Sequence, residues 1–122
     1  MKLGRKISGG KYKKQRKRKL HSIKGQERKI KLRDTKKKTL RVMGGNKKTI
    51  LLTEKFANVI DPETKKAKKV EIKNVLETKA NRFLARQNIL IKSAIIETEL
   101  GKAKITNRPS HDGNVQAVLV EG

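Results

Sequence analysis

Cysteine is absent from the 122 residues of this chain, and histidine occurs only twice, as His21 and His111. The lack of cysteine excludes a disulfide framework, a thiol nucleophile and a cysteine metal site. The two histidines stand 90 residues apart, without ligand-like spacing around either. No run approaches the roughly 18 apolar residues that a membrane span needs, and no apolar segment follows the basic N-terminus as in a secretory signal. We therefore expect a cytoplasmic protein.

Acidic residues are scarce, with 11 Asp and Glu against 34 Lys and Arg and a formal net charge of +23. The charge is unevenly distributed along the chain. Residues 1–48 hold 21 basic and 2 acidic side chains, whereas residues 49–122 hold 13 and 9. The length fits one domain. The pattern therefore predicts a very basic arm followed by a domain of nearly ordinary charge.

Apolar residues are also scarce in the first part of the chain. The first 29 residues contain six of them: Met1, Leu3, Ile7, Tyr12, Leu20 and Ile23. Ordering a residue costs roughly 1–2 kcal/mol of backbone entropy, and burying an apolar side chain returns roughly 1.5–3 kcal/mol. The arm is therefore not expected to fold on its own. Neutralised phosphates release counterions, so we expect the arm to order along a nucleic acid; the alternative is a disordered solubilising tail.

Short strands with period-two alternation are expected from residue 39 onward. They are predicted at 39–43, 49–53, 56–60, 68–75, within 89–100 on both sides of a break near Lys92 and Ser93, and at 103–106 and 115–120. Turns are expected at 44–46, at Asp61–Pro62 and at Asp112–Gly113.

A short helix is the one expected exception to the strands. Residues 78–88 break the β pattern and predict one or two helical turns, with Thr78 or Asn81 as the N-cap. The expected fold is mainly β: a small antiparallel β-barrel of about six or seven short strands with one short helix, over residues 39–122. An extended basic N-terminal arm, residues 1–38, precedes it.

Glycine and tyrosine add detail to the basic run of residues 11–19. Gly9 and Gly10, beside Ser8, let backbone N–H groups approach a phosphate without a Cβ in the way. Tyr12 is the sole tyrosine, and it either stacks on an unpaired base or sugar, or packs on the protein's own surface.

Further basic residues stand at predicted turns and on the predicted helix. Arg41, Lys47 and Lys48 surround a glycine turn, which is either a phosphate-contacting loop or an ordinary hairpin. Arg82 and Arg86 are four residues apart, so a helix places both on one face. Arg108 is a further phosphate-contact candidate in the loop of residues 107–114.

Catalytic and metal-binding patterns are not found. Glu97 and Glu99 share a strand face, which more often keeps a sheet soluble than pairs carboxylates for catalysis. His111 and Asp112 have no accompanying nucleophile, and the acidic residues near position 61 belong to a turn. We expect no enzymatic activity, no cofactor and no protein-held metal, with Mg²⁺ present only as an ion associated with RNA.

Five segments resemble a known family. "GRKISGGKY" (4–12), "RVMGGNKK" (41–48), "ANVIDPETKKAKK" (57–69), "IKSAIIETELGKAKITNRP" (91–109) and "DGNVQAVLV" (112–120) follow in order. Together they resemble the ribosomal protein S8e family of the small subunit, which archaea and eukaryotes share. The resemblance covers nearly the whole chain, and the length is similar to that of archaeal members. It implies a structural rRNA-binding protein with a small β-barrel, whose basic N-terminal arm runs into rRNA.

The candidate RNA contacts come partly from that resemblance and partly from charge. The resemblance implies contacts at Arg5, Lys6, Ser8, Gly9, Gly10, Lys11 and Tyr12, from Arg16 through Lys17 and Arg18 to Lys19, and at Gly44, Gly45, Asn46 and Lys47. Position and charge add Lys13, Lys14, His21, Arg41, Lys48, Arg82, Arg86 and Arg108.

The expected partners are small-subunit rRNA and neighbouring small-subunit proteins, with one copy per ribosome and no membrane or small-molecule substrate. The alternative function is a free, sequence-tolerant nucleic-acid-binding or RNA-chaperone protein.

Overall fold

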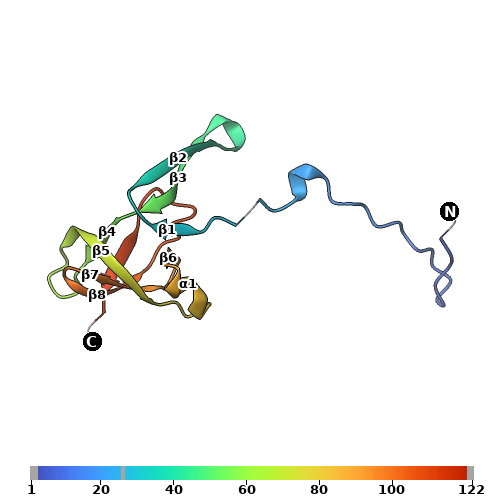
Figure 1. The fold of residues 1–122 in the computed structure, drawn as a ribbon. Coiled ribbons are helices and arrows are strands. Elements are labelled where there is room, and N and C mark those ends of the chain that lie inside the picture. Colours follow the sequence, from blue (N-terminus) through green and yellow to red (C-terminus); the bar gives the residue numbers. More distant parts are fainter. Residues whose placement is uncertain (1–2, 26, 121–122) are drawn as a thin grey trace.

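An exposed arm leads into the folded body in the computed structural model, which describes residues 3–25 and 27–120 (Figure 1). Every described residue from 3 to 29 is exposed, and burial begins at Ile30, of which 1% remains accessible. The arm contains one 3₁₀ turn, η1 (Leu20–Ser22), while residues 13–19 lack regular secondary structure. Met1, counted above among the apolar residues of the arm, lies outside the described residues.

A closed barrel forms one part of the body and confirms the predicted fold class. Its strands are β4 (Phe56–Ile60), β5 (Ala67–Glu77), β7 (Ile95–Thr98), β8 (Gly101–Ile105) and β9 (Gln116–Leu119). Consecutive neighbours pair antiparallel, and the parallel pair of β4 and β9 closes the barrel. Register shifts in the long β5, after Ile72 and after Val75, interrupt its ladder with β7. Such irregularities bend a strand, as closure requires.

A second, four-stranded sheet completes the body. It contains β1 (Ile30–Leu32), β2 (Lys36–Arg41), β3 (Lys47–Glu54) and β6 (Ile89–Leu90), in the order β2-β3-β1-β6. β2 and β3 form a hairpin around the 3₁₀ turn η2 (Met43–Gly45). The sequence does not predict β1, which pairs parallel with β3 and antiparallel with β6. The division of the chain at residue 38 stays a prediction; β1 and the first half of β2 precede it.

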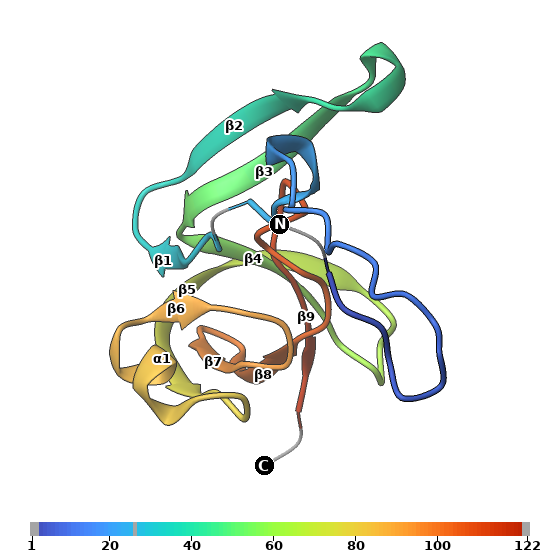
Figure 2. The same cartoon turned by 90° about the vertical axis from the view of Figure 1, so that its right-hand side faces the viewer.

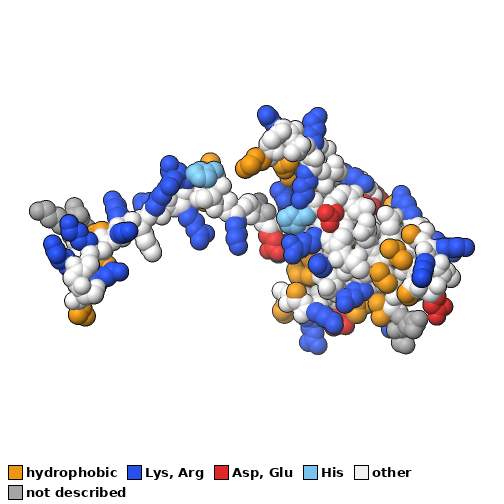
Figure 3. Space-filling view, turned by 180° about the vertical axis from the view of Figure 1, so that it is seen from behind, with side chains coloured by type: hydrophobic (Ala, Val, Ile, Leu, Met, Phe, Trp, Pro, Cys, Tyr) orange, Lys and Arg blue, Asp and Glu red, His pale blue; other side chains and the backbone are white. Residues whose placement is uncertain are grey.

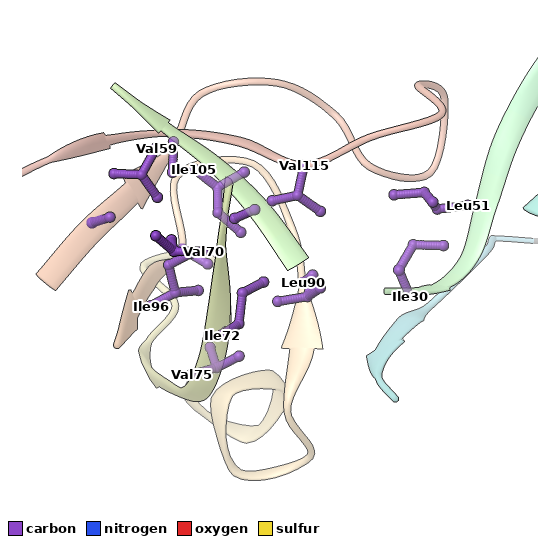
Figure 4. Close-up of a cluster of buried hydrophobic side chains, with 14 of the residues drawn as sticks. Ile30, Leu51, Val59, Val70, Ile72, Val75, Leu90, Ile96, Ile105 and Val115 are labelled. Atoms are coloured by element: carbon purple, nitrogen blue, oxygen red, sulfur yellow. The ribbon is translucent and has the colours of Figure 1, made fainter. Parts of the chain in front are cut away.

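One apolar core is shared by the barrel and the second sheet. Ile30 and Leu51 enter it from the sheet, while Val59, Ile96 and Ile105 enter it from the barrel (Figure 4). All five side chains are at most 1% accessible. Burial of such a side chain stabilises the fold by roughly 1.5–3 kcal/mol. The core therefore fixes β1, and with it the root of the arm, against the barrel.

A buried carboxylate holds the corner where the chain passes from β3 into β4. Glu54 is only 4% accessible. One of its oxygens accepts hydrogen bonds from the Thr35 hydroxyl at 2.5 Å and from the amides of Lys55 and Phe56 at 3.1 and 3.2 Å. Buried carboxylates are tolerated when they are hydrogen-bonded in this way. Glu54 thereby ties Thr35, just before β2, to the start of β4.

The predicted helix is present as α1 (Arg82–Arg86), between β5 and β6. Of the two expected N-caps, Asn81 has that role, because its side chain accepts from the amide of Phe83 at 2.9 Å. Thr78 instead donates its hydroxyl to the carbonyl of Asn81. Among the described residues, no helix has the length and apolar character needed to cross a membrane.

Candidate nucleic-acid interface

A tight turn forms the far end of the arm. Arg5 and Lys11 pair as an antiparallel bridge. Within it, the amide of Lys6 donates to the carbonyl of Gly10 at 2.8 Å, and the amide of Gly9 donates to Lys6 at 2.9 Å. Gly9 has φ +78°, a conformation that residues with a Cβ rarely adopt. Gly9 is therefore needed for the turn itself, and Ser8 and Gly10 lie exposed beside it.

Tyr12 lies directly after this turn with about half of its surface accessible, at 52%. The ammonium of Lys6 stands 5.8 Å from the centroid of its ring. Cation–π contacts of this kind hold a ring in place at modest energy. The accessible part of the ring leaves a surface on which a base or sugar can stack.

The basic run of the arm is extended and fully accessible. Its side chains are spread along the chain between the turn and the body (Figure 3). The predicted contacts in this run are Lys13, Lys14, Arg16, Lys17, Arg18 and Lys19. His21 follows in η1, where the Ser22 hydroxyl donates to the carbonyl of Lys19 at 2.9 Å. The run thus presents successive cations to solvent along one stretch of backbone.

The β2–β3 hairpin is a second basic element, and it projects from the body (Figure 2). Arg41 and Lys47 are direct partners in its ladder, and both are exposed. Gly44 and Gly45 have φ of +74° and +77°, which only glycine adopts readily. The amide of Val42 donates to the carbonyl of Asn46 at 2.8 Å, which closes the turn.

Lys48 faces the loop of residues 107–114 rather than open solvent. It is half-buried, and its Nζ lies 3.4 Å from Nδ1 of His111. A Cβ at Gly113 would lie 3.3 Å from Cγ2 of Thr49, so this loop packs closely on β3. Arg108 is exposed in the same loop, where its amide donates to the Asp112 carboxylate at 3.1 Å. The loop of residues 107–114 therefore lies beside the part of the hairpin close to its turn, and the two form one surface.

Arg82 and Arg86 lie at the other end of the body, away from the hairpin (Figures 1 and 2). Both are exposed, and with Lys79 they line a hollow of about 660 Å³ beside β5. The guanidinium of Arg86 also stands 5.8 Å from the ring of Phe83, itself 64% accessible. The structure brings these two arginines together as their spacing predicts, but separates them from the other candidates.

Additional cations that the sequence reasoning did not single out extend this surface. Lys36, Lys37 and Lys38 are all exposed along β2. Lys24 and Arg28 line a hollow of about 440 Å³ with Glu27 of the arm and with Ser110 and His111 of the loop of residues 107–114. The three consecutive lysines of β2 could have been identified from the sequence by their charge. No local sequence pattern marks the hollow, because its lining residues come from segments far apart in the chain.

The cations of the arm and the hairpin have no acidic partner in the described part of the chain. Across residues 3–25 and 27–120, the one ion pair within 4 Å joins Lys55, between β3 and β4, to Glu71 of β5 at 2.8 Å. The hydrogen bond from Lys55 to Glu71, together with their charge attraction, raises the pKa of Lys55 above its usual value of 10.5. Nor do those residues contain a cluster of His, Asp or Glu suited to a metal ion. Within the described residues, the positive charge of the arm and the hairpin is therefore not offset by ion pairs.

A family model described as ribosomal protein S8e matches residues 1–120. The chain belongs to the ribosomal protein S8e family. It is 49% identical over 117 residues to the small ribosomal subunit protein eS8 of Methanococcus aeolicus, covering 95% of this chain and 91% of that one. It is 48% identical over 118 residues to the protein of the same name from Sulfolobus acidocaldarius, with the same coverage.

Membership confirms the resemblance drawn from the five sequence segments. A third relative, the small ribosomal subunit protein eS8 of Methanocorpusculum labreanum, is 45% identical over 117 residues, covering 96% of this chain and 94% of that one. Ribosomal protein S8e is a structural component of the translation machinery and not an enzyme. RNA binding follows from the family, and the uncompensated cations are the groups suited to it.

Proposed function

We propose that this chain is a structural constituent of the small ribosomal subunit. It binds and stabilises small-subunit rRNA through phosphate contacts and so supports translation in the cytoplasm. The observation that carries the proposal is the arm, in which every described residue from 3 to 29 is exposed and no described cation has an acidic partner within 4 Å. The relatives, which the chain matches over nearly its full length, are themselves named small ribosomal subunit proteins.

The mechanism is one of shape and charge. Phosphate contacts position a protein on nucleic acid without reading sequence, and an extended arm can lie between closely spaced RNA backbones. Each contact releases condensed counterions, which contributes a slope of roughly −0.7 to −0.9 to log K against log salt. The arm neutralises phosphates that would otherwise repel each other, and the shared core anchors it through Ile30 of β1.

The partners follow from this function. They are the small-subunit rRNA and neighbouring small-subunit proteins, with one copy of the chain per ribosome. No small-molecule substrate is involved, and Mg²⁺ takes part as an ion held by the rRNA.

A salt titration tests the phosphate contacts. The affinity of the full chain for small-subunit rRNA is measured between low and moderate salt, for the parent and for a Lys13→Gln, Lys14→Gln, Lys17→Gln triple variant. In the triple variant, the negative slope of log K against log salt should become less steep by roughly 0.7–0.9 per substitution. The thermal midpoint should stay unchanged, because all three side chains are exposed. Lys66→Gln, in the turn after β4, is the matched control and leaves the slope as it is. An unchanged slope in the triple variant would refute the phosphate contacts.

Cosedimentation separates this function from free, sequence-tolerant nucleic-acid binding. A subunit constituent travels with small subunits through a moderate salt wash and protects one confined region of rRNA. An RNA chaperone binds DNA and unrelated RNA with comparable affinity and stays in the soluble fraction after gentle lysis.

A further inference from the structure

An apolar side chain stands at the end of the basic hairpin. Met43, in the turn between β2 and β3, is 94% accessible, and the preceding Val42 is 41% accessible. A methionine side chain buries substantial apolar surface when it finds a partner, worth roughly 1.5–3 kcal/mol. Within this protein Met43 has almost no such contact. The position therefore suits contact with another molecule.

The backbone that presents Met43 is fixed by short-range hydrogen bonds. The carbonyl of Met43 accepts from Nδ2 of Asn46 at 3.3 Å, and the Val42 amide donates to Asn46 at 2.8 Å. The left-handed Gly44 and Gly45 complete the turn. Met43 is thus held at a defined point of the hairpin, which lowers the entropy cost of using it in binding.

The charge around Met43 selects the kind of partner. No acidic residue occurs between residues 35 and 53. Arg41 and Lys47 flank the turn on opposite strands, and the three exposed lysines of β2 continue the positive surface. A polyanion complements this uniformly positive surface.

We propose that Met43 packs against the face of an unstacked base of the rRNA, with Arg41 and Lys47 on the flanking phosphates. This inference rests on the proposed function. A double-stranded RNA helix exposes phosphates and 2′-hydroxyls, and apolar base faces become accessible in loops and bulges. Methionine is among the side chains that proteins insert between bases, and its sulfur is well suited to aromatic surfaces. The hairpin therefore recognises a non-helical element by apolar contact, in addition to charge.

Affinity and salt dependence together test this contact. Full-length parent, Met43→Ala, Met43→Leu and Lys47→Gln chains are titrated against small-subunit rRNA. Met43→Ala is expected to bind about tenfold more weakly with an unchanged salt slope, since the lost contact is apolar. Met43→Leu keeps near-parental affinity. Lys47→Gln should make the negative slope of log K against log salt less steep by roughly 0.7–0.9. Chemical probing should show one base that the parent protects and Met43→Ala leaves reactive.

Three results would overturn the inference. In the first, Met43→Ala binds and protects rRNA as the parent does. In the second, Met43→Ala weakens binding only through a smaller salt slope. In the third, Met43→Ala binds free rRNA normally but fails to enter subunits, which would assign Met43 to a protein neighbour. A parent chain without preference for small-subunit rRNA over unrelated RNA would instead overturn the proposed function and this inference together. Thermal unfolding of Met43→Ala should match the parent, since the side chain is exposed.

Discussion

Arg41 and Lys47 lie directly opposite each other in the β2–β3 ladder, the pair nearest the turn. Side chains of directly opposite residues project from the same face of a sheet, with their Cβ atoms about 4.5–5.5 Å apart. Neither cation has an acidic partner among the described residues. The free protein therefore contains a like-charge pair that a bound phosphate would relieve.

Lys47→Glu should have opposite effects on folding and on RNA binding. It replaces repulsion across the ladder by attraction, so the free energy of unfolding should rise by about 0.2–1 kcal/mol in urea titrations. The affinity for small-subunit rRNA should fall, with a smaller salt slope. Lys47→Gln only removes the repulsion. Its free energy of unfolding and its affinity for rRNA should therefore lie between those of the parent and those of Lys47→Glu. A Lys47→Glu chain that is less stable and binds RNA as tightly as the parent would contradict this account of the hairpin.

Gly45→Ala should loosen the hairpin turn. Gly45 has φ +77°, and a residue with a Cβ pays roughly 1–2 kcal/mol in that conformation. Hydrogen exchange of the Val42 amide, which closes the turn onto Asn46, should accelerate severalfold. Gly25→Ala is the control, since a Cβ there meets no atom within 4 Å and its φ is not left-handed. Equal exchange rates of the Val42 amide in Gly45→Ala and the parent would show that a Cβ at position 45 does not strain the turn.

Glu54→Leu should destabilise the body strongly. The substitution leaves the Thr35 hydroxyl and the amides of Lys55 and Phe56 without their acceptor. An unsatisfied buried donor costs roughly 1–3 kcal/mol, so urea unfolding should show a loss of at least about 2 kcal/mol. Glu71→Gln removes only the partner of a half-exposed ion pair and should cost about 0–1 kcal/mol. Comparable losses in both variants would show that the corner at Glu54 has no special role.

Acid pH should weaken the turn after β4. The Asp61 carboxylate accepts from the Thr64 hydroxyl and from the Glu63 amide, and these hydrogen bonds hold the pKa of Asp61 below its ordinary 3.8. Because the folded pKa is the lower one, the contribution of Asp61 to stability is present above about pH 3.8 and is lost as the pH falls through the folded pKa. An NMR titration of the Asp61 carboxyl group measures this.

The Thr64 hydroxyl is the larger cause of that shift, so Thr64→Val should return the Asp61 midpoint toward 3.8. Thr106→Val, whose hydroxyl donates to Gln116 instead, should leave the midpoint where it is. A midpoint at or above 3.8 in the parent would contradict the predicted direction.

Local patterns predicted most strands of the body. β4 is found at Phe56–Ile60 as expected, because its alternation ends at an Asp-Pro turn. The break expected near Lys92 and Ser93 separates β6 from β7, and Ser93 has φ +66°. Such signals are contained in a few neighbouring residues, so sequence reasoning can use them.

Elements that depend on distant pairing could not be predicted in the same way. β1 has three residues, only Ile30 is fully buried, and Lys31 at its centre is exposed. Its formation depends on β3 and β6, which follow later in the chain. The contact between Lys48 and His111 likewise requires the loop of residues 107–114 to fold back onto β3.

The strand order leaves little backbone free for pairing with a second copy of the chain. The barrel is closed, so within residues 3–25 and 27–120 the sheet edges are β2 and β6 of the four-stranded sheet. β6 has two residues, and β2 begins with three consecutive lysines. Short or lysine-bearing edges discourage edge-to-edge association. The lysines along β2 therefore make free copies of the chain repel one another at this edge, which disfavours strand-to-strand aggregation before RNA is bound.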